Sequence, residues 1–295
     1  MPISSSNGRA LPYIDALFTA ASATCVTGLV TVGTAASWSV FGQIVILLLI
    51  QIGGLGIITF MTAVMLLFNR KIGISDRLLI QDAFNLNTLS GIVTFVKKVL
   101  AGTLTVEGIG ACFYMLVFVP QFGAKGIWIS IFNSVSAFCN AGFDIIGDGK
   151  SMLSYRHDPL VLCTLAILVA IGGLGFIVWE DIIAKKSWKR LNVYSKVIIL
   201  AQIFFIVVGT FVYFILEYGN INTIGAESVG QKILASFFQS VTTRTAGFDA
   251  LIQNNLTDLS KAWGTVLMMI GGASGSTAGG VKLGTAVLVI MTLIS

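Results

Sequence analysis

Charged side chains are scarce in this 295-residue chain, which has 18 Lys and Arg and 13 Asp and Glu, only 11% of its residues. A soluble domain carries roughly 25% charged residues, because a body of this size must cover its surface with them. Apolar residues make up 56% of the chain, and the mean hydropathy is +0.92. A water-soluble globule is therefore excluded, and the sequence predicts an integral membrane protein.

Histidine and cysteine are rare as well. The one histidine, His157, lies in a predicted loop, so the spans hold no His-containing catalytic dyad, and we expect no enzyme activity. The four cysteines have no CxxC spacing, which disfavours a zinc site or a disulfide framework. A GxxxxGK[ST] motif is missing too, so neither ATP chemistry nor an organic cofactor is expected in this chain. The cysteines are Cys25, Cys112, Cys139 and Cys163.

The basic residues form no continuous stripe, so a nucleic-acid partner is not expected; they indicate topology instead. A spanning helix needs about 20 apolar residues, and four runs are long enough: 39–68, 92–119, 159–184 and 195–217. A fifth begins near Trp263 and breaks. The loops after the first and third runs carry clustered basic residues, which places both on the cytoplasmic side. These residues are Arg70, Lys71, Arg77, Lys185, Lys186, Lys189 and Arg190.

Residues 72–90, within a predicted cytoplasmic linker at 71–91, mix apolar and polar residues at helical spacing. An interfacial amphipathic helix accounts for this pattern. A docking surface for a cytosolic partner is the alternative, and the sequence does not separate the two.

An internal repeat surrounds three glycines. When Gly28, Gly142 and Gly247 are aligned without gaps, a phenylalanine stands ten positions before each of them. The surrounding strings are ATCVTGL, AFCNAGF and TTRTAGF. Each follows an apolar stretch too short to cross a bilayer, at 12–24, 126–138 and 230–242, and further glycine clusters recur downstream. The repeated unit is a helix, a short re-entrant helix, a glycine turn and a second helix.

This unit is typical of ion conduction. Non-helical backbone at membrane depth is tolerated where it is buried in protein or lines a water-filled path, and the C-terminus of a half-helix attracts cations. Close helix packing is the alternative role for glycine in membranes. We favour packing for Gly53, Gly54, Gly172 and Gly173, and a filter role for the three aligned glycines.

These strings resemble the potassium transporters of the Trk/Ktr/HKT family, most of all the membrane subunit of bacterial Ktr systems. The resemblance implies an all-α fold of repeated helix–pore helix–filter–helix units, a fused potassium-channel-like pore. It assigns 1–70 to repeat 1 without its first helix, 92–190 to repeat 2 and 191–295 to repeat 3, with repeat 4 missing from the chain. Backbone coordination of K+ is expected at Val26, Thr27, Gly28, Leu29, Asn140, Ala141, Gly142, Phe143, Thr245, Ala246, Gly247 and Phe248.

A glycine-rich loop matches the family segment that breaks the second helix of repeat 3 and gates the pore. Residues 271–280 contain five glycines and otherwise only Ala, Ser and Thr, and each glycine disfavours helix by about 1 kcal/mol relative to alanine. A crossing of small residues is the alternative. The proposed gate consists of Gly271, Gly272, Ala273, Ser274, Gly275, Ser276, Thr277, Ala278, Gly279, Gly280 and Lys282, whose charge we expect to repel permeating ions.

Four further charged residues are candidates. Asp144 and Asp249 follow the glycine turns and are expected at the external mouth, where they either concentrate cations or bond the filter backbone. Glu107, inside the second span, is expected to be structural in preference to ion-binding. Arg244 precedes a filter glycine and is expected to brace the filter from behind.

The resemblance also implies partners. These are the lipid bilayer of the inner (plasma) membrane, a second copy of the chain, and a cytosolic nucleotide-binding ring. Potassium is the expected cargo, and no metal cofactor site is expected; a coupling or activating role for Na+ is left open. The alternative function is a secondary transporter of a small organic solute, which also uses broken helices.

Overall fold

The computed structural model describes residues 2–68, 73, 78–82, 91–147 and 151–294. Regular structure within these ranges is helical, which confirms the all-α prediction. The predicted linker at 71–91 lies largely outside the described residues. The first repeat contains η1 (Pro2–Ser4), α1 (Tyr13–Thr24), α2 (Thr34–Ser37), α3 (Val40–Leu55) and α4 (Ile57–Leu67).

The residues predicted as repeats 2 and 3 share one order of elements, a long helix followed by a short helix and then a broken helix. The second contains α6 (Ile92–Phe122), α7 (Ala124–Phe138), η2 (Ser151–Tyr155), α8 (Pro159–Gly173), α9 (Phe176–Lys185) and η3 (Trp188–Arg190). The third contains α10 (Val193–Glu217), α11 (Val229–Thr242), η4 (Gln253–Asn255), α12 (Asp258–Met269) and α13 (Leu283–Ile294).

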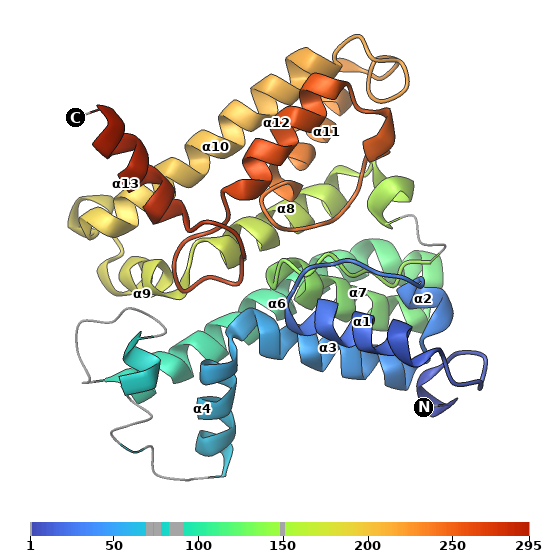
Figure 1. Cartoon of the computed structure of the whole chain (residues 1–295), viewed down its shortest axis with the longest axis horizontal. Helices are drawn as coiled ribbons and strands as arrows, with labels where there is room; N and C mark the ends of the chain where they lie inside the picture. The colour runs from blue at the N-terminus through green and yellow to red at the C-terminus, as the bar shows by residue number, and fades with distance from the viewer. Residues whose placement is uncertain (1, 69–72, 74–77, 83–90, 148–150, 295) are drawn as a thin grey trace.

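The three short helices predicted from the repeat are present as α1, α7 and α11. Local sequence explains where α11 begins, because Ser228 and Gln231 form a reciprocal capping box at its N-terminus. Similarly, the Asp158 side chain accepts backbone hydrogen bonds at the start of α8, and proline occupies the first turn. α1 packs on α3, α11 on α10 and α8, and α7 on both α6 and α8. The second repeat therefore lies between the other two (Figure 1).

The second helix of every repeat is broken, whereas the sequence predicted a break in the third repeat only. The expected continuous spans at 39–68 and 159–184 are wrong in this respect. α8 and α9 meet at 94°, and the break lies at Gly175, whose φ is +86°. Gly56, with φ +82°, separates α3 from α4 in the same way. A left-handed glycine ends a helix readily, so one such residue is enough to redirect an apolar run.

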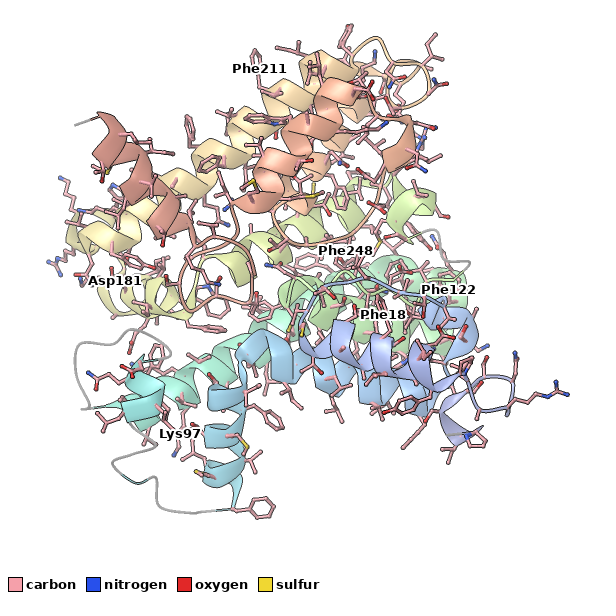
Figure 2. The ribbon with its side chains drawn as sticks, in the orientation of Figure 1. Phe18, Lys97, Phe122, Asp181, Phe211 and Phe248 are labelled. Atoms are coloured by element: carbon pink, nitrogen blue, oxygen red, sulfur yellow. The ribbon has the colours of Figure 1, made fainter. Side chains whose placement is uncertain are left out.

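Two helices among the described residues, α6 and α10, are long and apolar enough to cross a membrane, and the two bent pairs bring the number to four. One face of α10 is apolar and exposed, with Phe204 59%, Val207 59% and Phe211 64% accessible. Such a continuous apolar surface is stable against lipid and unstable against water. Phe211 lies at the edge of the molecule, while Phe248, which is fully buried, lies at its centre (Figure 2).

Candidate functional site

The three glycine turns, defined as residues 25–29, 139–143 and 244–248, lie against one another at the centre of the fold. A Cβ placed on Gly28 would lie 2.7 Å from the carbonyl oxygen of Ala141, and one on Gly142 would lie 3.0 Å from that of Ala246. The first turn therefore contacts the second, and the second contacts the third. Residues more than 200 positions apart in the chain are brought to one place.

Each turn has the same backbone geometry. In every turn the glycine and the residue two before it have positive φ: Val26 +56° and Gly28 +78°, Asn140 +56° and Gly142 +70°, Thr245 +64° and Gly247 +76°. This conformation is a steric outlier for Val and Thr, and such outliers persist only where the surrounding structure enforces them. Residues of positive φ thus alternate with a residue of negative φ in each of the three turns.

Hydroxyl groups on the short helices hold the second and third turns. Ser136 Oγ donates to the Phe143 carbonyl and Thr242 Oγ1 donates to the Phe248 carbonyl, each at 2.6 Å. The sequence analysis placed both carbonyls in the ion path. Each of these two carbonyl oxygens thus accepts one hydrogen bond from the short helix, which occupies one of its two lone pairs. In the first turn the Ser22 and Thr27 hydroxyls bond each other at 2.8 Å.

The short helices end directly before the turns, with Thr24, Phe138 and Thr242 as their last residues. Their C-terminal carbonyls therefore direct partial negative charge at the turns. Gly53 and Gly172 lie against two of these ends, since a Cβ on either would be 2.1 Å from the carbonyl oxygen of Thr24 or Phe138. Their proximity agrees with the packing role predicted for them. Sequence reasoning had not identified that they pack on the helix ends.

A cavity of about 150 Å³ opens above the turns and is lined by all three glycines, Gly28, Gly142 and Gly247, together with Asp144 and Asp249. Burial raises the pKa of Asp144 to about 6; a hydrogen bond from the Ile146 amide opposes this shift, and the charge of Asp249 adds to it. Burial also raises the pKa of Asp249. The carboxyl groups of Asp144 and Asp249 thus line one small cavity together with the three glycines.

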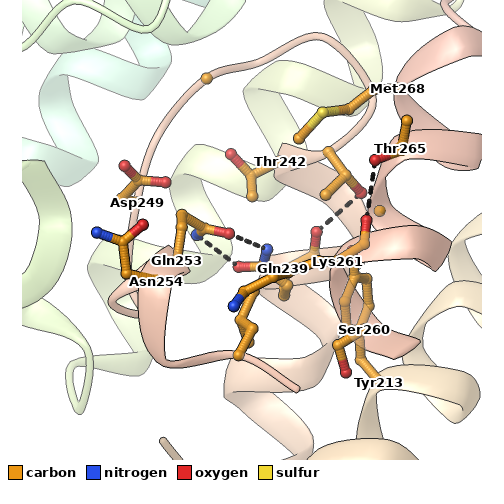
Figure 3. Close-up of a pocket in the computed structure, with 14 residues that line it drawn as sticks. Tyr213, Gln239, Thr242, Asp249, Gln253, Asn254, Ser260, Lys261, Thr265 and Met268 are labelled. Atoms are coloured by element: carbon orange, nitrogen blue, oxygen red, sulfur yellow. Dashed lines mark hydrogen bonds between the residues drawn. The ribbon is translucent and has the colours of Figure 1, made fainter. Parts of the chain in front are cut away.

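A second cavity, of about 310 Å³, lies beside the third turn and shares Gly247 and Asp249 with the first. Figure 3 shows its polar wall, where the side-chain amides of Gln239 and Gln253 exchange hydrogen bonds of 2.9 and 3.2 Å. The backbone amide of Asp249 donates a hydrogen bond to Ser151 Oγ. Sequence reasoning missed these amides, because neither glutamine belongs to the repeated pattern.

The glycine-rich loop is docked on the break of the second repeat. The amide of Ala273 donates to the Gly173 carbonyl at 2.9 Å, and the amide of Phe176 donates to the Gly275 carbonyl at 2.9 Å. The Thr277 hydroxyl donates to the carbonyl of Phe138, at the end of α7. The loop therefore joins the broken helix of one repeat to the short helix that precedes a glycine turn.

Two cations lie at this loop. Lys282 Nζ donates to the Ala278 carbonyl at 2.9 Å, within the loop itself. Arg244, only 7% exposed, donates to the carbonyls of Gln202 at 3.4 Å and Gly271 at 3.3 Å. Its guanidinium therefore lies between α10 and the start of the loop.

Glu107 is buried inside α6, and its Oε2 accepts a hydrogen bond of 3.1 Å from Gln51 Nε2. The other amide atom of Gln51, Oε1, accepts from the thiol of Cys139, at the start of the second turn. The partner of Glu107 on α3 is thus a neutral amide, and the pair connects α6 to the backbone beside the turn. No cluster of three or more His, Cys, Asp or Glu suited to a metal occurs in the described ranges.

Comparison with known proteins gives consistent results. A family model described as "TrkH: Cation transport protein" matches residues 3–295. The chain is 39% identical to "Ktr system potassium uptake protein B" of Bacillus subtilis (strain 168), over 100% of the chain and 66% of the relative. It is 40% identical to "Potassium/sodium uptake protein NtpJ" of Enterococcus hirae, over 97% of the chain and 63% of the relative. The chain thus spans slightly less than two thirds of the length of these relatives.

A solved structure shares the fold. It is titled "Crystal Structure of the Potassium Transporter TrkH from Vibrio parahaemolyticus" and matches with a TM-score of 0.73 at 20% identity, over 95% of this chain and 54% of that one.

Proposed function

Because the chain belongs to the TrkH family of cation transport proteins, we propose that it forms part of a pore that carries K+ across the cell membrane. The observation that supports this most directly is the convergence of the three glycine turns, each with the same two left-handed residues, on one cavity. Three repeated interruptions with one geometry and one location favour a single shared path.

Backbone carbonyls of the turns replace the hydration shell of the ion. These are the carbonyls of Val26, Thr27, Gly28, Leu29, Asn140, Ala141, Gly142, Phe143, Thr245, Ala246, Gly247 and Phe248, of which those of Phe143 and Phe248 also accept a hydrogen bond from the short helices. The helix ends behind the turns and the two carboxylates at the mouth favour a cation over an anion. All three central positions are glycine, for which the family resemblance implies preference for K+; a coupling role for Na+ stays open, since one relative carries both ions in its name.

The loop at 271–282 serves as the gate in this proposal. Its hydrogen bonds to Gly173, Phe138 and Phe176 hold one position, and its glycines allow other positions once those bonds break. Lys282 places a positive charge on the loop, which opposes cation passage while the loop remains docked. If Lys282→Ala leaves basal K+ flux unchanged, this role for the charge is wrong.

The proposed setting is the bacterial inner membrane. A second copy of the chain and a cytosolic nucleotide-binding ring are the proposed partners, the latter contacting the basic loops around Lys185 and Lys189.

The test is K+ and Na+ uptake in cells that lack their own potassium uptake, with the wild type compared with Gly142→Ser. A Cβ at Gly142 meets the Ala246 and Gly247 carbonyl oxygens at 3.0 and 3.1 Å, so we expect a fall in K+ preference over Na+. Gly230→Ala, where a Cβ meets nothing within 4 Å, is the control. Unchanged selectivity in Gly142→Ser would favour the organic-solute transporter instead.

A further inference from the structure

A small cavity lies behind the glycine turns, on the side where the short helices end. Its walls come from four parts of the chain: Asn140 of the second turn, Gly173 at the end of α8, Gln202 of α10, and Arg244 of the third turn. The cavity is also lined by Gly272 and Ala278 of the glycine-rich loop and by the apolar residues Val169, Ala170, Ile206 and Val241. The volume is about 10 Å³, which is about the space that one water molecule occupies.

Four polar atoms around this cavity have no hydrogen-bond partner among the described residues. They are Nδ2 and Oδ1 of Asn140, Oε1 of Gln202 and Nε of Arg244. The three residues are 2%, 5% and 7% exposed, respectively. Buried polar atoms are almost always hydrogen-bonded, to protein or to ordered water, so four unpartnered atoms around one cavity indicate a missing ligand.

The chemistry of the four atoms identifies the ligand. Two of them are donors, Arg244 Nε and Asn140 Nδ2, and two are acceptors, Asn140 Oδ1 and Gln202 Oε1. An anion satisfies only the donors, and a cation is opposed by the guanidinium. A water molecule accepts two hydrogen bonds and donates two, so it matches the set.

We propose that one buried water molecule occupies this cavity and joins the second and third glycine turns to α10 through Asn140, Arg244 and Gln202. The water fixes Asn140, a residue with left-handed backbone in the second turn, relative to Arg244, which already holds the loop through the Gly271 carbonyl. The positions of the second and third turns are thereby linked to the docking of the glycine-rich loop. For its transport readout this inference rests on the proposed function.

Gly173→Ala tests the proposal because it fills the cavity without a clash. A Cβ on Gly173 would lie 3.9 Å from Asn140 Nδ2 and 4.0 Å from Gln202 Nε2, in ordinary van der Waals contact. The matched control is Gly108→Ala on α6, where a Cβ meets nothing within 4 Å. Replacing a helical glycine by alanine is stabilising by itself, so the control reports that effect alone.

The first measurement is a density map of the purified wild type and of both variants, at a resolution that shows ordered water. We expect one peak in the wild type and in Gly108→Ala, within hydrogen-bond distance of Arg244 Nε and of the Asn140 amide, and none in Gly173→Ala. An empty wild-type cavity beside other visible buried waters overturns the proposal. Anomalous scattering from the cavity after exchange into bromide also overturns it, because the ligand is then an anion.

The second measurement is thermal stability together with uptake selectivity. Loss of the water leaves buried polar atoms unpaired, so we expect the melting temperature of Gly173→Ala to fall by at least about 2–4 °C and its preference for K+ over Na+ to decrease. A variant as stable and selective as Gly108→Ala overturns the linking role. If the wild type transports no K+ at all while the peak is present, the proposed function fails and the water site stands.

Discussion

The hydroxyl of Thr277 donates a hydrogen bond of 2.9 Å to the carbonyl of Phe138, the last residue of α7. Gly172 approaches the same place, since a Cβ there would lie 2.1 Å from that carbonyl oxygen and 2.7 Å from the hydroxyl. The glycine-rich loop, the end of a short helix and the helix α8 thus meet at one atom. In the proposed function, this contact holds the gate in its docked position.

Removing the Thr277 hydroxyl should loosen the loop. Thr277→Val keeps the volume of the side chain but leaves the buried Phe138 carbonyl without this donor, which destabilises the docked loop by about 1–3 kcal/mol. We expect basal K+ flux to rise, measured as rubidium uptake into vesicles. Thr292→Val on α13, whose exposed hydroxyl bonds only its own helix, should behave like the wild type. Equal flux in the two variants would contradict a gating role for this contact.

The first glycine turn should not accept a side chain. In Gly28→Ala the new Cβ meets the Ala141 carbonyl oxygen at 2.7 Å, and backbone cannot move aside as a flexible side chain does. We expect K+ uptake to fall at least about tenfold, equivalent to about 1.4 kcal/mol.

Gly123→Ala is the control for backbone strain alone. Gly123 also has positive φ, +60°, but a Cβ there meets nothing within 4 Å. Uptake should be retained in this variant. If both variants lose uptake equally, the close approach of the turns is not what excludes a side chain at Gly28.

Uptake of K+ should depend on pH because Asp144, which lines the cavity above the turns, titrates. The pKa of Asp144 is raised to about 6, chiefly by burial, so its carboxylate is ionised above pH 6 and neutral below. Attraction of cations to the mouth is therefore present at pH 7 and lost as the pH falls through about 6. We expect the concentration of K+ at half-maximal uptake to rise between pH 7 and pH 5. Asp144→Asn should show the weaker affinity at pH 7 and lose most of this dependence; an unchanged pH profile in Asp144→Asn would assign the titration to another group.

Glu107 should be replaceable by its amide. Glu107→Gln keeps an acceptor for Gln51 Nε2, which lies 3.1 Å from Glu107 Oε2, and keeps the size and shape of the side chain. We expect uptake within about twofold of the wild type, corresponding to about 0.4 kcal/mol at most. Glu107→Leu leaves the Gln51 amide unpaired and should lower the free energy of unfolding by about 1–3 kcal/mol. A large loss of K+ affinity in Glu107→Gln, with stability intact, would show that the carboxylate binds the ion.

The repeat was visible in the sequence because three short strings share a glycine, a preceding phenylalanine and a short apolar stretch. The helices α1, α7 and α11 follow from that pattern, as does the position of the turns after their ends. The all-α fold needed only the apolar composition and the long runs. These features depend on short stretches of sequence and on composition, so they could be predicted from the sequence.

The breaks at Gly56 and Gly175 could not be predicted with the same rules. Each lies within an apolar run that hydropathy treats as one span, and a helical glycine looks the same in sequence as a left-handed one. The hydrogen bonds of the Phe143 and Phe248 carbonyls were missed for a related reason. Ser136 and Thr242 precede their glycines by different numbers of residues, so the two hydroxyl donors do not align when the glycines are aligned.

The residues around the water cavity could not be predicted from local sequence either. Asn140, Gln202 and Arg244 are far apart in the chain, and only the packing of the second and third predicted repeats places these residues around one space.

The left-handed backbone at Gly28, Gly142 and Gly247 has a consequence for chirality. At positive φ the backbone of a D amino acid has as low a conformational energy as that of an L residue in an ordinary right-handed helix. An L-alanine at these positions changes two things together, the backbone energy and the space beside the neighbouring turn. A D-alanine introduced by chemical synthesis leaves the backbone energy favourable and moves the methyl group to the opposite face of the Cα. Comparing the L-alanine and D-alanine variants would thus separate the effect of backbone conformation from the effect of steric contact with the neighbouring turn.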